Sequence, residues 1–278
     1  TDLETKDTKA QGSATLKDAA FAIISLNENS VLVEGKLYKK NETVKTIQTG
    51  NDGIATTSAD LLPYGKYKLE ETKAPEGYLT DGAKAIEFSI TENGKIVDLT
   101  DESHSIYNQI KRGDLEGVKI GAGTHKRLAN VPFKITSKTT GESHIVVTDK
   151  NGQFSTASDW ASHKKNTNAG TSSEDGIWFG ISEPDDSKGA LLYDTYEIEE
   201  LSCESNKGMK LIPAFEVVVS RNKVTIDIGT LTDEYEKEIT IHTTATDKKT
   251  GEKVIVAGKK VTIVDTVTLD GLEAVSYT

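Results

Sequence analysis

Short stretches in which apolar and polar residues alternate recur along the chain, and they predict β-strands with one buried face. Residues 84–91 (KAIEFSIT) and 213–220 (PAFEVVVS) are two such stretches. The Asn-Gly pairs within ENGK, residues 92–95, and KNGQ, residues 150–153, are typical of hairpin turns. Short strands with turn signals at regular spacing predict an all-β fold built from antiparallel sandwiches.

The same order of elements occurs twice, in residues 16–108 and again in residues 128–233. Each copy begins with an apolar strand, LKDAAFAI or LANVPFKI, and continues through a Gly-centred turn to a Tyr-bearing strand, GKYKLEE or DTYEIEE, and a terminal strand. We therefore predict tandem Ig-like sandwiches, a first module at residues 1–112 and a second module at residues 113–236. The junction, QIKRGDLEG, is short, which predicts end-to-end stacking with limited swing.

The second copy is longer than the first. From the Phe of the apolar strand to the second Glu of the Glu-Glu pair, the first copy spans 50 positions (71 − 21) and the second spans 67 (200 − 133). The extra residues fall in a polar stretch, residues 158–180, that contains Trp160 and Trp178, so we expect an ordered surface loop. A binding role for this loop stays open. Exposed Trp side chains would favour binding, and buried ones would favour a structural loop.

After Glu236 the pattern changes. Residues 237–278 predict two or three further strands, which are too few to close an independent sandwich. We therefore expect the N-terminal part of a third, incomplete β domain there.

Composition narrows the classes of function. The net charge of −11 argues against a nucleic-acid partner and against contact with an anionic membrane, because both need clustered Lys and Arg. The five histidines show no metal-ligand spacing, so we expect no zinc and no other cofactor. A single cysteine, Cys203, cannot form an internal disulfide. No nucleophile with a partnered base stands in a recognisable motif, so the sequence does not predict an enzyme with an external substrate.

Residues 64–78, YGKYKLEETKAPEGY, closely resemble the E-box strand of Cna-B or SpaA-type domains in pilins and adhesins of Gram-positive bacteria. LANVPFKI resembles the family's second-strand element, with Asn130 where Gly is usual, and LKDAAFAI matches it less well, with Asp18 there. HTTATD and VTIVDTV, in the tail, resemble the start of ester-bond-forming repeats. The resemblance implies a structural segment of an extracellular, cell-wall-anchored protein, whose partners are neighbouring repeats and, through the parent protein, host matrix or cell-surface ligands.

In such domains a lysine on the first strand and an Asn or Asp on the last strand condense into an isopeptide bond, with a buried glutamate as catalyst. A lysine amine is a nucleophile only when neutral, and burial among apolar side chains favours the neutral form. Burial also favours a protonated glutamic acid, which polarises the acceptor carbonyl and relays the proton. In the second module the resemblance assigns these roles to Lys119, Glu200 and Asp233, and strand alternation predicts that Glu199 faces solvent.

The first module lacks one member of the same set. Glu71 and Asn108 occupy the catalytic and acceptor places, but the reactive lysine would stand immediately before Thr1. Lys6 and Lys9 lie nearby in a polar run, and we interpret them as solvated. We therefore expect this module to fold without the bond and to keep Glu71 as a buried acid with an elevated pKa.

Two further points stay open at this level. In the tail, the resemblance suggests Thr244 as an ester hydroxyl and Asp265 as its helper carboxylate, with the glutamine partner beyond Thr278. A lysine, a glutamate and an aspartate on three strands can also be ordinary exposed residues or a buried ion pair. The alternative function is a ligand-binding adhesin module that recognises host matrix or glycan through residues 158–180.

Overall fold

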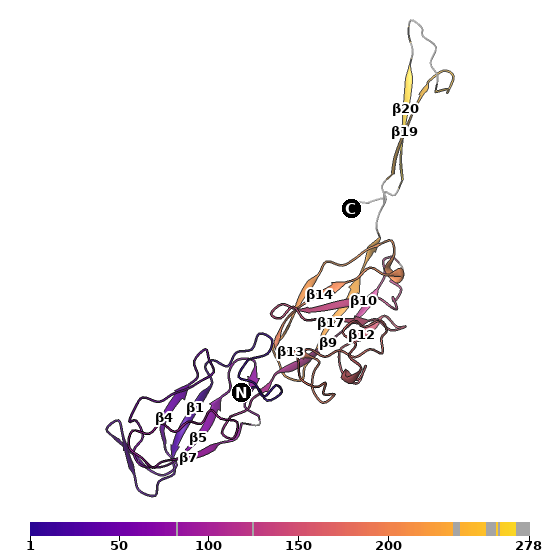
Figure 1. Cartoon of the computed structure of the whole chain (residues 1–278). Coiled ribbons are helices and arrows are strands. Elements are labelled where there is room, and N and C mark those ends of the chain that lie inside the picture. The colour runs from indigo at the N-terminus through magenta and orange to yellow at the C-terminus, as the bar shows by residue number, and fades with distance from the viewer. Residues whose placement is uncertain (82, 124, 236–239, 254–259, 261, 271–278) are drawn as a thin grey trace.

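The computed structural model describes residues 1–81, 83–123, 125–235, 240–253, 260 and 262–270. Two β-rich bodies follow one another along the chain, and a two-stranded hairpin comes after them (Figure 1). In the described residues, helical structure is limited to two short 3-10 turns, η1 (His163–Lys165) and η2 (Glu204–Asn206). The predicted all-β fold is confirmed. No helix of this part of the chain is long and apolar enough to cross a membrane.

The first module contains the strands β1 (Ala20–Ser25), β2 (Val31–Val33), β3 (Lys36–Tyr38), β4 (Thr43–Gln48), β5 (Gly65–Lys73), β6 (Tyr78–Leu79), β7 (Ile86–Ile90) and β8 (Gln109–Ile110). Its main sheet is antiparallel with strand order β4-β1-β5-β7. β2 pairs with β3, and β6 pairs with β8, in two small ladders. The Tyr-bearing strand with the Glu-Glu pair, β5, is therefore central in the sheet.

The second module contains the strands β9 (Arg112–Ile120), β10 (Pro132–Ser137), β11 (Ser143–Val147), β12 (Gln153–Ser155), β13 (Leu191–Leu192), β14 (Asp194–Glu200), β15 (Met209–Lys210), β16 (Phe215–Val219), β17 (Thr225–Thr232) and β18 (Glu234–Tyr235). One antiparallel sheet has the order β11-β10-β14-β16, and the other has the order β12-β9-β13 with β17 also on β9. β15 pairs with β18. Beyond this module, β19 (Thr240–Asp247) and β20 (Ile263–Asp270) form an antiparallel hairpin.

The first and last long strands of the second module, β9 and β17, run parallel. Lys119 lies opposite Leu231, and Ile120 lies opposite Thr232. This pairing differs from the purely antiparallel sheets that we predicted. A parallel pair needs a long crossover connection, and here nearly the whole module lies between the two strands. The pairing places Lys119 beside the residues that follow β17.

Both copies use the same local geometry at equivalent positions. Asp18 and Asn130 have positive φ values of 61° and 59°, where Gly is usual in the domains that the chain resembles. Asp and Asn tolerate this left-handed conformation better than other residues with side chains, which explains the substitutions. Buried Tyr67 and Tyr196 each donate a hydroxyl hydrogen bond to the carbonyl four residues earlier, at 2.9 Å and 3.1 Å. The repeat found in the sequence is thus also a repeat in structure.

The hairpins that we predicted at the two Asn-Gly pairs are wrong. After Gly94, residues 95–100 form no strand, so β7 has no hairpin partner there. The KNGQ turn closes with Gly152 at a φ of 68°, but β11 pairs with β10 whereas β12 pairs with β9 in the other sheet. Asn-Gly pairs predicted the turns, but the burial of apolar faces decides which strands pair.

Apolar side chains form two clusters. One lies within the first module and is built by residues of β1, β2, β4 and β5 and the segment before β5. The other fills the second module and also includes Leu16, Tyr78 and Ile110 of the first module. Because this cluster continues across the junction, the two modules share apolar contacts, in keeping with the limited swing that the short junction predicts.

Candidate functional site

Three ionisable side chains meet inside the second module. They are Lys119, Glu200 and Asp233, and all three side chains are fully buried. The Nζ atom of Lys119 lies 2.5 Å from Asp233 Oδ1 and 3.2 Å from Glu200 Oε2. The structure therefore brings the amine, the acid and the acceptor of the sequence-based hypothesis together in one site.

Strand alternation explains why these residues point inward. In β14, Tyr196, Ile198 and Glu200 are buried, whereas Glu199 is exposed as predicted. In the second half of β9 the buried positions alternate in the same way and include Lys119. Each of these two strands thus has one charged residue of the site at an inward-facing position. The parallel pairing of β9 with β17 brings Asp233, which follows β17, beside them.

The surroundings of the two carboxyl groups differ. The Nδ2 group of Asn206 donates to Glu200 Oε1 at 3.0 Å, and the backbone N–H of Ile212 donates to Glu200 Oε2 at 3.2 Å. Asp233 Oδ2 is buried and has no hydrogen-bond partner. Burial raises the pKa of Asp233 to about 6, although the hydrogen bond from Lys119 opposes the rise. A buried carboxyl group with a raised pKa therefore lies against a lysine amine.

The equivalent pair in the first module is Glu71 and Asn108. The Nδ2 group of Asn108 donates to Glu71 Oε2 at 2.6 Å and to the carbonyl of Leu79 at 3.0 Å. Burial raises the pKa of Glu71, as expected, but its side chain is half-buried rather than fully buried. Lys6 and Lys9 are exposed, and in the described residues no lysine forms an ion pair with Glu71. This site holds the acid and the acceptor without an amine from a lysine.

A buried ion pair joins the two modules. Arg112, at the start of β9, donates from Nε and Nη2 to Glu4 at 2.9 Å and 2.7 Å. Its guanidinium also donates to the carbonyls of Ala190 and Phe179 and lies 3.8 Å from the centre of the Trp178 ring. Burial alone would raise the pKa of Glu4, but the Arg112 hydrogen bonds lower it to about 2. A fully paired buried charge at this place resists separation of the modules.

The Ala-Pro-Glu-Gly-Tyr turn after β5 contacts the second module through Tyr193. The Tyr193 hydroxyl donates to the Glu76 carboxylate at 2.8 Å, and the Tyr193 carbonyl accepts the N–H of Ser13 at 3.1 Å. Gly77 has a φ of 86°, and a Cβ atom there would come within 2.5 Å of Ala14 Cβ and 2.9 Å of Tyr193 Cδ1. Both the conformation and the space require Gly. The most recognisable sequence motif of the first module therefore builds the joint.

The insertion of the second module packs against the sandwich and supports the joint. Trp178 is 2% exposed, and its Nε1 donates to the carbonyl of Ser182 at 2.8 Å. The ring of buried His163 lies 5.4 Å from the Trp178 ring, and Trp160 is partly buried. The ordered loop predicted from its two Trp residues is present, and Trp178 serves as the platform for Arg112 rather than as an exposed contact residue.

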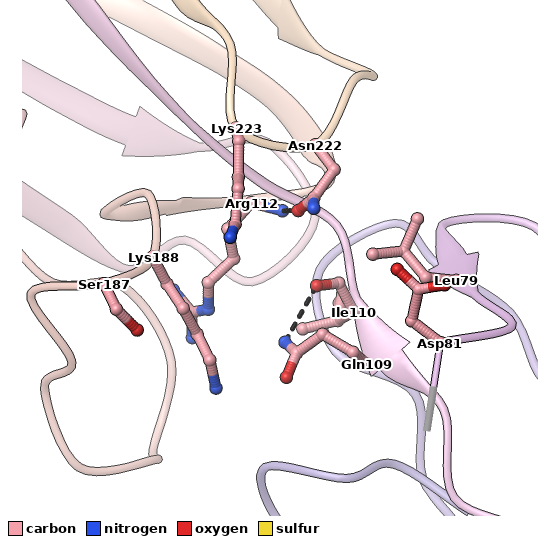
Figure 2. A pocket seen from close by; sticks show the side chains of 9 residues that line it. All are labelled: Leu79, Asp81, Gln109, Ile110, Arg112, Ser187, Lys188, Asn222 and Lys223. Carbon is pink, nitrogen blue, oxygen red and sulfur yellow. Dashed lines mark hydrogen bonds between the residues drawn. The ribbon is translucent and has the colours of Figure 1, made fainter. Parts of the chain in front are cut away.

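A pocket of 290 Å³ opens beside the joint (Figure 2). It is lined by Leu79, Asp81, Gln109, Ile110, Arg112, Ser187, Lys188, Asn222 and Lys223. Arg112 pairs with Glu4 at 2.7 Å, and Lys188 pairs with Glu4 at 3.3 Å and with Asp185 at 3.6 Å, so both cations have carboxylate partners at the joint. We therefore assign the pocket to the joint and not to a ligand. The described residues also contain no group of His, Cys, Asp or Glu that suits a metal ion.

The two tail residues of the ester hypothesis lie on the hairpin of β19 and β20. Thr244 is opposite Thr266, and Ala245 is opposite Asp265. Because neighbouring positions of a strand point to opposite faces, Thr244 and Asp265 project from different faces of the hairpin. The roles of Thr244 and Asp265 in an ester stay predictions. Both side chains are exposed, and the hairpin pairs with no third strand of the described chain.

Sequence reasoning missed three residues of these sites. Asn206 lies in LSCESNKGMKL, where the first module has KAPEGY, and this departure from the repeat is the signal that could have drawn attention to it. Glu4 and Arg112 carry no such signal. They meet only because the modules stack end to end, and strand patterns do not encode that contact.

Comparison with family models identifies two parts of the chain. Residues 1–103 match the SpaA family, described as a prealbumin-like fold domain. Residues 239–278 match the T-Q ester bond containing domain. No curated protein matches the chain.

Among solved structures, the chain is similar to the Bacillus anthracis TIE protein, with 18% identity and a TM-score of 0.45 over 94% of this chain and 42% of that one. It is similar to GBS52, the minor pilin of Streptococcus agalactiae, with 16% identity and a TM-score of 0.31 over 81% and 86% of the two chains. It is also similar to a C-terminal fragment of the pilus adhesin SpaC from Lactobacillus rhamnosus GG, with 13% identity and a TM-score of 0.41 over 84% and 94%. The chain thus spans less than half the length of the TIE protein. By its family matches, it carries a SpaA prealbumin-like domain at residues 1–103 and a T-Q ester bond domain at residues 239–278.

Proposed function

We propose that the chain is a structural stalk segment of an extracellular, cell-wall-anchored pilin or adhesin of a Gram-positive bacterium, and that it joins Lys119 to Asp233 in an isopeptide bond. The two family matches support the class of surface protein. The observation that carries the crosslink is the distance of 2.5 Å from Lys119 Nζ to Asp233 Oδ1 in a buried site with Glu200. Neighbouring repeats and, through the parent protein, a host ligand are the partners.

The proposed reaction is a single self-crosslinking event with no external turnover. The Nζ–Cγ bond forms between Lys119 and Asp233, one Cγ–O bond of Asp233 breaks, and water leaves. Glu200 lies within reach of the amine and relays its proton. The carboxyl and amine groups of this chain are sufficient for the step, and the proposal includes no cofactor.

The mechanical advantage follows from where the bond lies. It would close a loop of 114 residues, for which the chain-entropy model gives a stabilisation of about 4 to 5 kcal/mol. Because β9 and β17 are neighbours at the two ends of the module's chain, tension along the chain would load the covalent bond instead of the strand hydrogen bonds. A secreted protein without paired cysteines gains by this bond what a disulfide would give.

The joint supports the stalk and not the alternative function. Arg112 and Glu4 fix the modules to each other, and Trp178 of the insertion is buried beneath Arg112. An exposed Trp beside a groove would have favoured host-ligand binding through residues 158–180. The buried position of Trp178 favours a load-bearing insertion.

Peptide mapping tests the crosslink. Digestion of the denatured chain and tandem mass spectrometry should give a branched peptide that joins Lys119 to Asp233 and lacks one water. Asp233→Ala is the matched control and should give two separate linear peptides. Linear peptides from the unmodified chain would contradict the proposal. In the first module, Asn108 should appear in a linear peptide.

A further inference from the structure

Asn206 is a buried amide to which the proposed reaction gives no role so far. It ends η2 and is 1% exposed. Its Oδ1 accepts the backbone N–H of Cys203 at 2.7 Å, and its Nδ2 donates to the carbonyl of Leu201 and to Glu200 Oε1, both at 3.0 Å. Because the oxygen is fixed by a backbone donor, the nitrogen must face Glu200. The network leaves only one orientation of this amide.

Both oxygens of Glu200 receive an N–H. Asn206 binds Oε1, and the backbone of Ile212 binds Oε2 at 3.2 Å. A carboxylate accepts hydrogen bonds at both oxygens, whereas a carboxylic acid carries its own proton on one of them. Two donors, one at each oxygen, therefore fix the orientation of the Glu200 carboxyl group and hold Oε2 3.2 Å from Lys119 Nζ.

The acceptor carboxyl has the opposite surroundings. Asp233 Oδ2 is buried without a hydrogen-bond partner, and Oδ1 alone receives the amine. A bare oxygen in a low-dielectric site is better placed to carry a proton than a charge. The two carboxyl groups thus differ in the way that separates a base from an electrophile.

We propose that Asn206 is a positioning residue, which holds the carboxyl group of Glu200 beside the amine so that Glu200 takes the first proton of Lys119 while Asp233 is the electrophile. The inference rests on the proposed crosslink. The ammonium gives one proton to Glu200, and the neutral amine attacks Cγ of Asp233. A second amine proton leaves with the Asp233 hydroxyl as water, the third stays on the amide, and Glu200 ends protonated. Atoms and charge balance without another reactant.

In the first module, the equivalent glutamate receives its side-chain N–H from the acceptor position itself. There the acceptor is Asn108, whose own Nδ2 donates to Glu71 Oε2 at 2.6 Å. An Asp acceptor has no amide to donate, so the second module must supply the N–H from another residue. Asn206 does this from the segment in which the second module departs from the KAPEGY turn. The departure from the repeat and the change of acceptor are therefore linked.

The test is the rate of water loss from newly made full-length chain. Denatured chain from cell-free synthesis is diluted into buffers from about pH 5 to about pH 9, stopped in acid at intervals and weighed by mass spectrometry. Asn206→Ala should slow the reaction at least about tenfold across this range, because Glu200 Oε2 is then no longer held beside Lys119 Nζ. Asn206→Asp keeps the acceptor for the Cys203 N–H but loses the N–H that orients Glu200, so it should fold and still react as slowly as Asn206→Ala.

Asn166→Ala is the control, because Asn166 also donates a side-chain N–H to a carbonyl, that of Trp178 at 3.2 Å, outside the site. It should react at the rate and pH profile of the unmodified chain. Asn206 variants that fold by circular dichroism and react at the wild-type rate, or an Asn206→Asp chain that regains that rate, overturn the positioning role. An unmodified chain that loses no water overturns the crosslink itself, so the two failures are distinguishable.

Discussion

The site of Glu71 and Asn108 and the site of Glu200 and Asp233 occupy equivalent places in two copies of one fold, yet they hold different chemical groups. Both glutamates end the same inward-facing pattern of a central strand. Only the second site holds a lysine, and only there is the glutamate fully buried. The comparison teaches that the strand motif specifies where the acid lies, whereas the groups around it decide whether it has a reaction to catalyse.

Removal of the catalyst in the second module should have the largest effect. Glu200→Ala should leave Lys119 and Asp233 unjoined, so that no water is lost. The free energy of unfolding should fall by about 4 to 5 kcal/mol through the lost loop constraint alone. Denaturant unfolding together with intact mass measures both effects. Glu71→Ala is the matched control in the first module and should still lose one water relative to its own sequence mass. Any other mass difference in that variant would contradict the distinction between the two sites.

The joint should give the next largest effect. Arg112→Ala removes the main partner of buried Glu4 and leaves it only Lys188, at 3.3 Å, as a cation. The loss of one partner of a buried pair typically costs about 3 to 5 kcal/mol. Small-angle X-ray scattering should show a wider range of angles between the modules. The double variant Arg112→Ala with Glu4→Gln removes the unpaired charge and should recover part of the stability. A double variant no more stable than Arg112→Ala would show that the charge is not the cause.

Acid should weaken the same joint. The pKa of Glu4 is lowered from 4.5 to about 2. The stability that ionised Glu4 gives the folded protein is therefore present above about pH 4.5 and is lost as the pH falls toward 2. This lowering of the pKa corresponds to about 3 kcal/mol in the free energy of unfolding. Glu4→Gln should be less stable than the wild-type chain at neutral pH, and this difference in the free energy of unfolding should disappear in acid. Parallel stability curves for the two proteins would contradict the assignment.

Glu71→Gln should have a small effect of opposite sign. Burial raises the pKa of Glu71, so the stability linked to its protonated form is present below its ordinary value and is lost as the pH rises through the raised pKa. A Gln side chain there is neutral at every pH and keeps an oxygen for the Asn108 N–H. The Gln variant should therefore be as stable or more stable by less than about 1 kcal/mol. Urea unfolding at two pH values measures the difference in stability between Glu71→Gln and the wild-type chain. A clear destabilisation by Gln at neutral pH would contradict this prediction.

Thr244→Ala should have the smallest effect. Thr244 is exposed on the hairpin and faces away from Asp265, so we expect no ester within these 278 residues. The variant and the unmodified chain should show the same loss of mass. An ester found by peptide mapping within the chain would be contrary to this expectation.

The sequence was sufficient to predict the β fold, the repeat and the meeting of Lys119, Glu200 and Asp233, because alternation and repeat alignment fix inward positions on each strand. It failed at the Asn-Gly turns, where a local signal cannot tell which sheet receives the next strand. It also missed Glu4 with Arg112, because their pairing depends on the packing of whole modules. Long-range contacts between segments without a shared pattern lie outside what periodicity can show.

The most direct measurement is the intact mass of the denatured wild-type chain. The account predicts the sequence mass minus one water, with no additional loss of ammonia, because Lys119 and Asp233 condense whereas Asn108 has no lysine partner. Loss of one ammonia alone would place the crosslink at Asn108, with Lys6 or Lys9 as the amine. The full sequence mass would contradict the central claim that the buried site of the second module forms a covalent bond.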